Sequence, residues 1–413
     1  MSEEFPPVYL EGDRIVVPGL ATAHSHAFQR ALRGRTQRRQ TKAGSFWSWR
    51  ALMYELASKL DPDDIFNFSR FAFTELAMSG VTAVGEFHYL HHQPDGTPYD
   101  DRLVMSEAII GAAKEVGIRL TLIRTAYFRA GFKKQAEGAQ KRFCDASTEE
   151  TLADVSTLFT RYQDDEMVQL ALAAHSIRAV SLEQLKELAQ YAQEGGLPFH
   201  MHVAEQDREI KECKLEYGMR PIVLLGTNGL LSERFVAIHA THVNSGEMKA
   251  LGDAKAMVCL CRTTERDLGD GLPESAEFIE AGIRLCVGVD SHASSDGFEE
   301  IRAIELDERS RTKARTVAAE GPELLKIATC NGYLAIGGSA AWEQDKIYLN
   351  AREPSMAGAN DDLLTDAVIF GATPRAVDEV VVAGETIVKD GWHVHYADAL
   401  TGYETSLRKL GLL

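Results

Sequence analysis

The alternation of short apolar runs with amphipathic segments is the feature that most restricts the fold of this sequence. Eight runs have the apolar, strand-like character of buried strands, at 14–26, 81–88, 118–128, 168–176, 197–205, 235–242, 256–263 and 283–292. Helix-like segments lie between many of them, at 63–80, 102–117, 181–196, 245–255 and 275–282, and several end in glycine before the next strand. This alternation is typical of parallel βα units, and eight units predict an α/β fold, a (β/α)8 TIM-type barrel.

A doubly wound open sheet is the alternative arrangement of the same elements. The glycine-rich phosphate loops of such folds are not found after the first strand, where neither GxGxxG nor GxxxxGK[ST] occurs. Beyond about residue 336, short β-branched runs at 344–350, 366–371 and 377–395 predict a small antiparallel β unit. The opening residues can add a strand to it. We therefore expect a small β domain from residues 1–18 and 337–413, beside a barrel at 19–336.

Charge and cysteine usage restrict the partners of the chain. A formal net charge of -17 argues against binding to nucleic acid or to an anionic membrane surface. No apolar run reaches membrane-spanning length, and the acidic opening "MSEEFPPVYL" is unlike a signal peptide. The six cysteines form no CxxC pair and are expected as free thiols, with Cys259 and Cys261 packed in the core. We expect a cytoplasmic protein, and a homodimer for a barrel of this size.

Histidines gather where the predicted strands end. Of thirteen histidines, only His393 and His395 lie elsewhere. The polar residues at the strand ends are His24 and His26; Glu86, His88, Tyr89, His91 and His92; His175 and Arg178; His200, His202 and Glu205; His239 and His242; and Asp290 and His292. Active sites of such barrels lie on the face where the strands end. Imidazole and carboxylate groups bind zinc and similar ions, and a catalytic site keeps one position open for water, so the clustering predicts a metal centre.

Strand alternation adds detail to this centre. His24 and His26 project to one side of the first strand, and one histidine of the fifth strand with Asp290 of the eighth completes a ligand set. A lone carboxylate at the end of the apolar run "LCVGVD" is costly without a cation or donor, although a helix N-cap is the alternative for Asp290. The ion makes its bound water acidic enough to supply hydroxide near neutral pH. Glu205 and His239 are the candidates for proton transfer.

Eight segments together resemble a known family. "HSHAFQRAL", "FWSWR", "EFHYLHH", "AAHSIRAV", "HVAEQ", "HATH", "LGDG" and "DSHAS" occur in the order seen in formimidoylglutamate deiminases, and the similarity runs with gaps from about residue 17 to 336. These enzymes belong to the mononuclear aminohydrolase branch of the amidohydrolase superfamily. No lysine closes the predicted fourth strand, as the binuclear branch would require. The resemblance implies conversion of N-formimidoyl-L-glutamate to N-formyl-L-glutamate and ammonia in histidine degradation.

The resemblance also implies roles for individual residues. The metal ligands fall on His24, His26, His202 and Asp290, the catalytic residues on Glu205, His239 and Asp290, and the substrate contacts on Gln29, Arg50, Tyr89, His175 and Arg178. One divalent ion is implied, zinc first, with iron(II) and manganese also suited to this ligand set. The hypothesis is that metal-bound hydroxide attacks the formimidoyl carbon, Glu205 passes a proton to the leaving nitrogen, and His239 stabilises charge. Two arginines and a tyrosine suit a small dicarboxylate, and Arg50 is expected in a loop over the site.

Two departures from the family and three alternatives stay open. The segment before the first barrel strand is short, and Arg262 and Arg266 add charge after strand seven, either facing a more acidic substrate or lying on the surface. The alternatives are an aminohydrolase for another amidine, guanidine or amino-heterocycle, a metal-dependent amide hydrolase, and a catalytically silent barrel used as a scaffold. His88, His91 and His92 are expected to hydrogen-bond and pack around Tyr89 rather than to bind a second metal.

Overall fold

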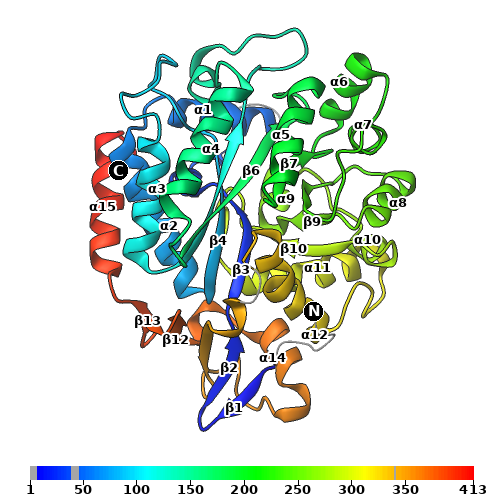
Figure 1. Ribbon diagram of the computed structural model, residues 1–413. Helices are drawn as coiled ribbons and strands as arrows, with labels where there is room; N and C mark the ends of the chain where they lie inside the picture. Colours follow the sequence, from blue (N-terminus) through cyan, green and yellow to red (C-terminus); the bar gives the residue numbers. More distant parts are fainter. Residues whose placement is uncertain (1–6, 39–45, 339–340) are drawn as a thin grey trace.

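The computed structural model describes residues 7–38, 46–338 and 341–413, so most of the acidic opening, residues 1–6, lies outside the described part. Eight parallel strands form a barrel with helices around it (Figure 1). The strands are β3 (Leu20–Ser25), β4 (Val81–His88), β5 (Arg119–Ala126), β6 (Val168–Ser176), β7 (Phe199–Val203), β8 (Phe235–His239), β9 (Met257–Leu260) and β10 (Arg284–Val287). A parallel bridge between Ser25 and Asp290 connects the first barrel strand to the segment after the last. The predicted (β/α)8 barrel is confirmed.

The helices of the barrel follow the strands in chain order. They are α1 (Phe46–Ala57), α2 (Pro62–Met78), α3 (Val104–Val116), α4 (Thr148–Tyr162), α5 (Leu182–Glu194), α6 (Asp207–Tyr217), α7 (Pro221–Thr227), α8 (Ser245–Asp253), α9 (Arg262–Leu268), α10 (Ser275–Glu280), α11 (Gly297–Thr312), α12 (Gly321–Lys326) and α13 (Gly332–Ala335). Short helical turns are η1 (Ala27–Leu32), η2 (Gly138–Phe143), η3 (Ile327–Asn331), η4 (Ala341–Glu343), η5 (Asp361–Leu363) and η6 (Pro374–Ala376). Capping boxes at Asp61, Ser181 and Asn244 fix where α2, α5 and α8 begin.

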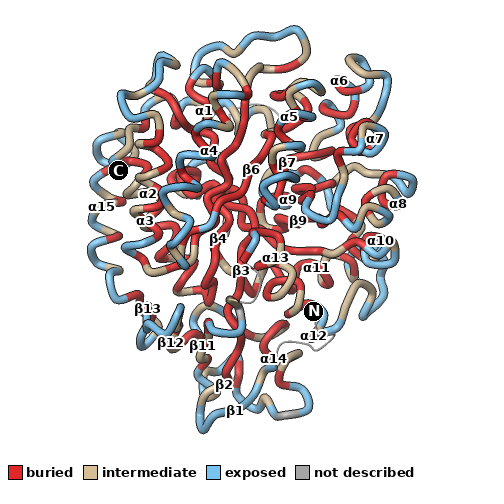
Figure 2. Tube along the Cα trace, in the orientation of Figure 1, coloured by how far each residue is buried: buried red, intermediate tan, exposed pale blue. Residues whose placement is uncertain are grey.

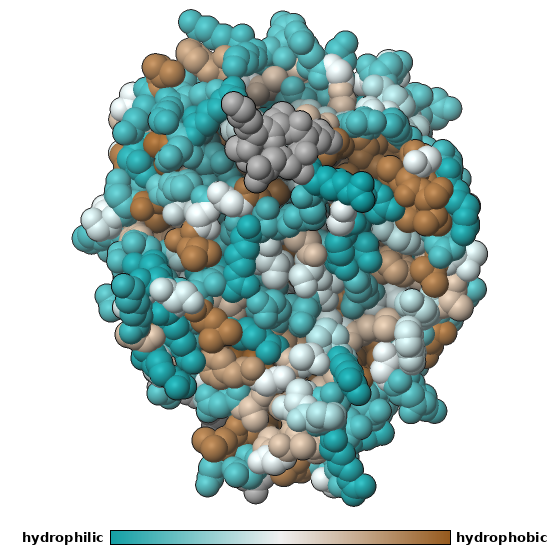
Figure 3. All heavy atoms as spheres, turned by 180° about the vertical axis from the view of Figure 1, so that it is seen from behind, coloured by the Kyte–Doolittle hydropathy of each residue, from teal (hydrophilic) through white to brown (hydrophobic). Residues whose placement is uncertain are grey.

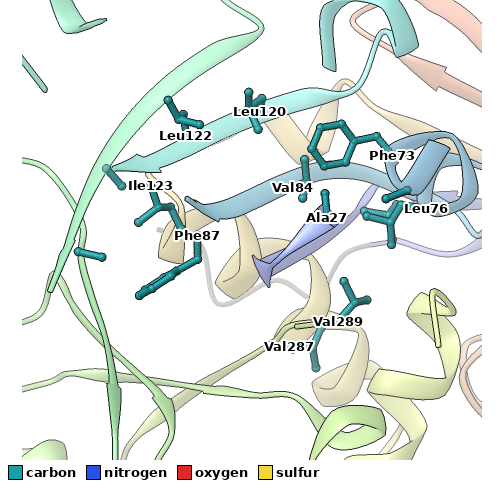
Figure 4. Close-up of a cluster of buried hydrophobic side chains, with 14 of the residues drawn as sticks. Ala27, Phe73, Leu76, Val84, Phe87, Leu120, Leu122, Ile123, Val287 and Val289 are labelled. Carbon is teal, nitrogen blue, oxygen red and sulfur yellow. The ribbon is translucent and has the colours of Figure 1, made fainter. Parts of the chain in front are cut away.

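The barrel strands are the most deeply buried part of the chain (Figure 2). All eight residues of β4 are buried, as expected for a parallel strand covered on both faces. Figure 4 shows Phe73 and Leu76 of α2 beside Val84 of β4 and Leu120 of β5. Side chains at the strand ends are therefore held by a close-packed frame, which limits their movement relative to one another.

A six-stranded antiparallel sheet lies below the barrel in Figure 1 and combines both ends of the chain, as predicted. Its strands, in order, are β1 (Tyr9–Glu11), β2 (Arg14–Pro18), β11 (Lys346–Asn350), β12 (Val377–Val382), β13 (Glu385–Lys389) and β14 (Trp392–His393). The run predicted as one strand at 14–26 divides at Gly19, with β2 in this sheet and β3 in the barrel. A Cβ atom at Gly19 would lie 2.2 Å from Thr82 Oγ1, so the close passage of the chain there requires glycine.

Two helices interrupt the C-terminal region. The prediction of a strand at 366–371 is wrong, because the segment belongs to α14 (Leu364–Gly371), in which Leu364 and Val368, one turn apart, are both buried. A second helix, α15 (Tyr396–Lys409), lies along α2 of the barrel (Figure 1), where Tyr403 stacks on Phe71 with ring centroids 4.3 Å apart. The division of domains at residues 18 and 337 stays a prediction.

The face of the molecule in Figure 3 is mostly hydrophilic, in keeping with the net charge of -17. Across the described residues, every helix is too short or too polar to traverse a bilayer. The six cysteines are unpaired, and Cys213, Cys259, Cys261 and Cys286 are buried.

Candidate metal centre and active site

Four side chains from distant parts of the sequence converge at the mouth of the barrel, and we call them the mouth cluster: His24, His26, His202 and Asp290. Asp290 Oδ1 lies 3.3 Å from Nε2 of His24 and 3.3 Å from Nε2 of His26. His202 Nε2 lies 3.1 Å from His24 Nε2. All four are buried. The predicted ligand set is therefore brought together, and the choice of His202 over His200 agrees with the geometry, since His200 Nε2 instead lies 2.9 Å from the Ala335 carbonyl.

Barrel closure places Asp290 beside the two histidines of β3. Its backbone N–H donates to the His24 carbonyl at 3.1 Å, and its carbonyl accepts from the His26 N–H at 2.8 Å. Asp290 has the left-handed backbone conformation, with φ of 48°, which is unusual for a residue with a side chain. Such strained residues gather at functional sites, where the surrounding structure holds them in place. The alternative of a helix N-cap is not observed, because Asp296 caps α11.

Backbone carbonyls orient two of the imidazole rings. His26 Nδ1 lies 3.0 Å from the Phe87 carbonyl and His202 Nδ1 lies 3.0 Å from the His175 carbonyl. A proton on Nδ1 satisfies each carbonyl and leaves the Nε2 lone pair facing the cluster, as in histidines that bind metal ions. Burial lowers the pKa of all three rings, to about 3 for His24, so they are neutral imidazoles. Neutral rings are the form that can act as ligands.

The spacing of these atoms fits a divalent metal ion. In a tetrahedral zinc site, N and O ligands about 2.0–2.2 Å from the ion lie roughly 3.3 Å from one another. The three measured separations are 3.1–3.3 Å. Burial opposes ionisation of Asp290, but its hydrogen bond with His24 and the positive charge of the nearby His239 ring lower its pKa below the usual range. One carboxylate and three imidazoles therefore form a donor set with a negative charge and no permanent cation.

Glu205 and His239 lie at the edge of this cluster. His239 ends β8, with Nδ1 3.3 Å from Glu265 Oε1 and Nε2 3.7 Å from Asp290 Oδ2. Burial disfavours the charged form of His239, but the carboxylates of Glu205, Glu265 and Asp290 raise its pKa to about 10. Burial raises the pKa of Glu205 to about 8, against the opposing effect of His239. Near neutral pH the pair can therefore exchange protons with a bound reactant.

Two further glutamates, which the sequence analysis did not single out, hold this pair. Glu209 accepts hydrogen bonds from the N–H groups of Ala204 (2.9 Å) and Glu205 (3.3 Å), at a turn where Ala204 has φ of 53°. Glu265 contacts His239 and also accepts from the Cys261 N–H at 3.0 Å. The sequence signal for both is their position four residues after a strand-end residue, Glu205 or Cys261, at the start of the next helix.

A small cavity opens onto the mouth cluster. Its lining residues are His26, Gln29, Phe46, Trp49, Arg50, Met53, Tyr54, Tyr89, Tyr127, Phe143, His175, Arg178, His202, Glu205, His239, Leu268 and Asp290. Every predicted substrate residue is in this set. Gln29 Nε2 donates to the Tyr89 hydroxyl at 2.9 Å, while Gln29 Oε1 has no hydrogen-bond partner within the described residues.

Two arginines give the cavity its positive charge. Arg50 Nε donates to the Tyr54 hydroxyl at 2.5 Å, and Arg178 Nη1 donates to the Tyr127 hydroxyl at 3.2 Å. Within the described chain neither guanidinium has a carboxylate partner within 4 Å, in contrast to the buried Arg124, which pairs with Asp145 and Asp154. Arg50 lies on α1, so its expected place in a loop is wrong. The aromatic run "FWSW" forms the first turn of that helix instead.

The arginines after strand seven do not reach this cavity. Arg262 is fully buried, donates to the Pro273 carbonyl at 2.9 Å and contacts the Ser275 hydroxyl. Arg266 lies on the surface and forms ion pairs with Glu299 and Asp307. Of the two roles left open for these residues, contact with an acidic substrate finds no support in the geometry.

Three of the remaining strand-end histidines belong to a separate buried group, the arginine cluster: His88, His91, His92, Arg124, Asp145 and Asp154. Arg124 donates to Asp145 and to Asp154, both at 2.8 Å. His91 Nε2 lies 2.5 Å from Arg124 Nη1, and His92 Nε2 lies 3.5 Å from Asp145 Oδ1. The expectation that these histidines pack around Tyr89 is therefore wrong, because the Arg124 ion pairs organise them.

Similarity to known proteins agrees with this geometry. Residues 15–387 match the Amidohydrolase family. The chain belongs to the amidohydrolase family. It is 36% identical to the formimidoylglutamate deiminase of Pseudomonas aeruginosa, over 92% of this chain and 85% of that protein. It is 29% identical to the 8-oxoguanine deaminase of the same organism, over 91% and 83% of the two chains.

A solved structure shows the same architecture. The crystal structure of an amidohydrolase from Brucella melitensis superposes with a TM-score of 0.89 at 32% identity, over 98% of this chain and 95% of that one. The chain described in Figure 1 is therefore a hydrolase of the deaminase type, which acts on carbon–nitrogen bonds. Its mouth cluster is a group of histidine and aspartate side chains able to hold a metal ion.

Proposed function

We propose that this amidohydrolase removes the imino group of N-formimidoyl-L-glutamate, giving N-formyl-L-glutamate and ammonia, with one divalent metal ion in the mouth cluster. The observation that supports this substrate most directly is the pair Arg50 and Arg178, which face the cavity without carboxylate partners in the described chain. The similarity to a formimidoylglutamate deiminase supports the same substrate. Zinc is the first candidate ion, and iron(II) and manganese suit the same donors.

The substrate carries two carboxylates, and the cavity offers two guanidinium groups for them. Charge-assisted hydrogen bonds from arginine to carboxylate are about twice as strong as neutral ones and fix orientation when they are bidentate. Tyr54 and Tyr127 hold the two guanidinium groups in place. Tyr89 and the unpaired Gln29 Oε1 remain for polar groups nearer the reacting carbon. An amino-heterocycle has no charge that would neutralise the two arginines.

A divalent ion in the mouth cluster supplies Lewis acidity that lowers the pKa of water and polarises the amidine. Glu205 takes a proton from the attacking water at its carboxylate and returns it to the departing nitrogen, so that water adds, the carbon–nitrogen bond breaks and ammonia leaves. Its pKa of about 8 allows both transfers near neutral pH. His239, held through Nδ1 by Glu265, presents Nε2 to the charge that develops on the oxygen bound to the reacting carbon.

Ammonia release from purified, zinc-loaded protein tests the proposal. N-formimidoyl-L-glutamate is compared with N-formimidoylglycine, which lacks the second carboxylate, and with 8-oxoguanine and 5-methylthioadenosine. We expect turnover of the glutamate compound, with kcat/KM for the glycine compound lower by about 10- to 100-fold, the value of one charged hydrogen-bonded group. Equal turnover of both compounds, or turnover of a purine alone, would contradict the proposal.

Replacing the arginines sharpens this test. Arg50→Gln and Arg178→Gln should each raise KM for formimidoylglutamate by about 10- to 100-fold, because each removes a charged donor. The same variants should change turnover of the glycine compound unequally, since only one carboxylate is left to bind. Arg266→Gln is the matched control, since Arg266 pairs with Asp307 outside the cavity, and its KM should stay unchanged.

A further inference from the structure

A second set of metal-binding atoms lies directly beside the mouth cluster. It consists of His239, Cys261 and Asp290, whose donor atoms all lie within 4.8 Å of one another. Asp290 is common to both sets, and its two oxygens are divided between them. Oδ1 lies 3.3 Å from His24 and His26, whereas Oδ2 is 3.7 Å from His239 Nε2. A carboxylate in this orientation can bridge two cations.

Cys261 supplies the donor that distinguishes this second set. It follows β9, is fully buried, and is held from its backbone by the bond from its N–H to Glu265. Gly288 makes room for the thiol next to the cluster, because a Cβ atom there would lie 2.9 Å from Cys261 Sγ and 2.7 Å from His24 Cβ. Glu265 also holds His239 through Nδ1, so a single carboxylate fixes two of the three donors.

We propose that His239, Cys261 and Asp290 form a second, inhibitory cation site that takes a thiophilic divalent ion such as Cd²⁺ or excess Zn²⁺. A set of one sulfur, one nitrogen and one oxygen donor favours such ions over Mg²⁺ or Ca²⁺. Binding forms bonds from the metal to Sγ and to His239 Nε2, and both the thiol proton and the Nε2 proton of the charged His239 ring leave to solvent. The ion also occupies His239 Nε2, which removes that nitrogen from the reaction.

The surroundings favour a cation at this position and give it a route of entry. Carboxylates of Glu265 and Asp290 lie within 3.7 Å of the His239 ring nitrogens. His239 and Asp290 both line the open cavity, so an ion reaches these two donors from solvent before it contacts the buried thiol. The binding of the second ion does not depend on the substrate. Only the inhibition rests on the proposed function.

The test uses full-length protein loaded with one equivalent of Zn²⁺ and then titrated with Cd²⁺. Bound metal is counted after dialysis, the ultraviolet charge-transfer band of a cadmium–thiolate bond is recorded, and ammonia release is measured in parallel. Cys261→Ala and Cys261→Ser are compared with wild type. Cys286→Ala is the matched control, because Cys286 is an equally buried thiol on β10 outside the donor set.

We expect wild type and Cys286→Ala to bind a second equivalent of metal, to show the thiolate band and to lose activity. The Cys261 variants should bind one equivalent without the band, and the Cd²⁺ concentration for half inhibition should rise at least tenfold. A wild-type protein that binds only one ion, or a Cys261 variant that keeps the second ion and the band, would overturn the proposal. Should formimidoylglutamate not be a substrate, the metal count and the band still decide the second site.

Discussion

The mouth cluster and the arginine cluster both bury histidines at the ends of barrel strands, but they balance charge in different ways. In the arginine cluster, the permanent charge of Arg124 lies between Asp145 and Asp154. In the mouth cluster, one carboxylate faces three neutral imidazoles, and among the described residues no arginine or lysine lies within ion-pair distance of it. A buried carboxylate needs a positive partner. Of these two histidine clusters, therefore, the mouth cluster is the one with a place for a metal ion, although both look alike in the sequence.

Removing one histidine from each cluster is the most direct way to break this comparison. His202→Asn takes away one of four donors, so metal affinity should fall by at least about 100-fold, and turnover should fall with it. His91→Asn should keep one metal ion per chain and its turnover. Metal content after dialysis and ammonia release measure both effects. Equal metal content in the two variants would mean that the mouth cluster is not the metal centre.

Glu205→Gln separates proton transfer from metal binding within the mouth. The amide cannot accept the proton of water, so kcat should fall by about 10²- to 10⁴-fold while the metal content is unchanged. Glu212→Gln, which changes a half-buried glutamate paired with Arg208 on α6 outside the cavity, should behave as wild type. A nearly fully active Glu205→Gln enzyme would contradict the assignment of Glu205 as the proton carrier.

Asp145→Asn tests whether the arginine cluster stabilises the fold through its ion pairs and takes no part in metal binding. In the variant, the buried positive charge of Arg124 keeps only one carboxylate partner, Asp154. The free energy of unfolding in urea should therefore decrease by about 3–5 kcal/mol. Asp165→Asn, which breaks a surface pair with Lys114, should cost about 0–1 kcal/mol. Metal content should be unchanged in both. Loss of the metal ion from Asp145→Asn alone would show that the two clusters are not independent.

The smallest expected effect is a change in how stability depends on pH. Burial and the nearby charge of Arg124 lower the pKa of His88 from 6.5 to about 3. Between these values the unfolded chain takes up a proton that the folded chain does not, so the free energy of unfolding falls as pH decreases. The neutral form of His88 makes its full contribution to the free energy of unfolding above pH 6.5. Below pH 6.5 this contribution declines by about 1.4 kcal/mol per pH unit. Urea unfolding of His88→Gln from pH 7 to 4 should show a slope smaller by this amount, and an unchanged slope would contradict the shift.

Much of the architecture could be predicted from sequence, because parallel barrel strands are continuous apolar runs separated by helices. The errors have local physical causes. The run "DAVIFG" is apolar enough for a strand, but its buried residues lie on one face of α14. The run at 14–26 is continuous in hydrophobicity, and only the close contact at Gly19 shows where it leaves the small sheet. No helix was predicted at 148–162, where the polar face of α4 outweighs its apolar residues.

The candidate site was predictable as far as residues at strand ends define it. His24, His26, His202 and Asp290 share that position and meet in space. Tyr54 and Glu209 lie on helices, and their orientation depends on packing that no local pattern records. Arg50 illustrates the limit, since its place in the cavity was predicted and its place on a helix was not. The distinction between the two histidine clusters also required structure, because Asp145 and Asp154 come from a different segment than the histidines that they surround.

The bridge between Ser25 and Asp290 has a mechanical meaning for the whole fold. The bridge closes the barrel where the first strand, β3, meets the segment after the last strand, β10. His24 and His26 lie on one side of this junction and Asp290 lies on the other. An ion bound by these three residues would link the two edges of the barrel, and His202 would connect the same ion to β7. Loading with metal would then strengthen a contact that the backbone hydrogen bonds of Asp290 with His24 and His26 already make.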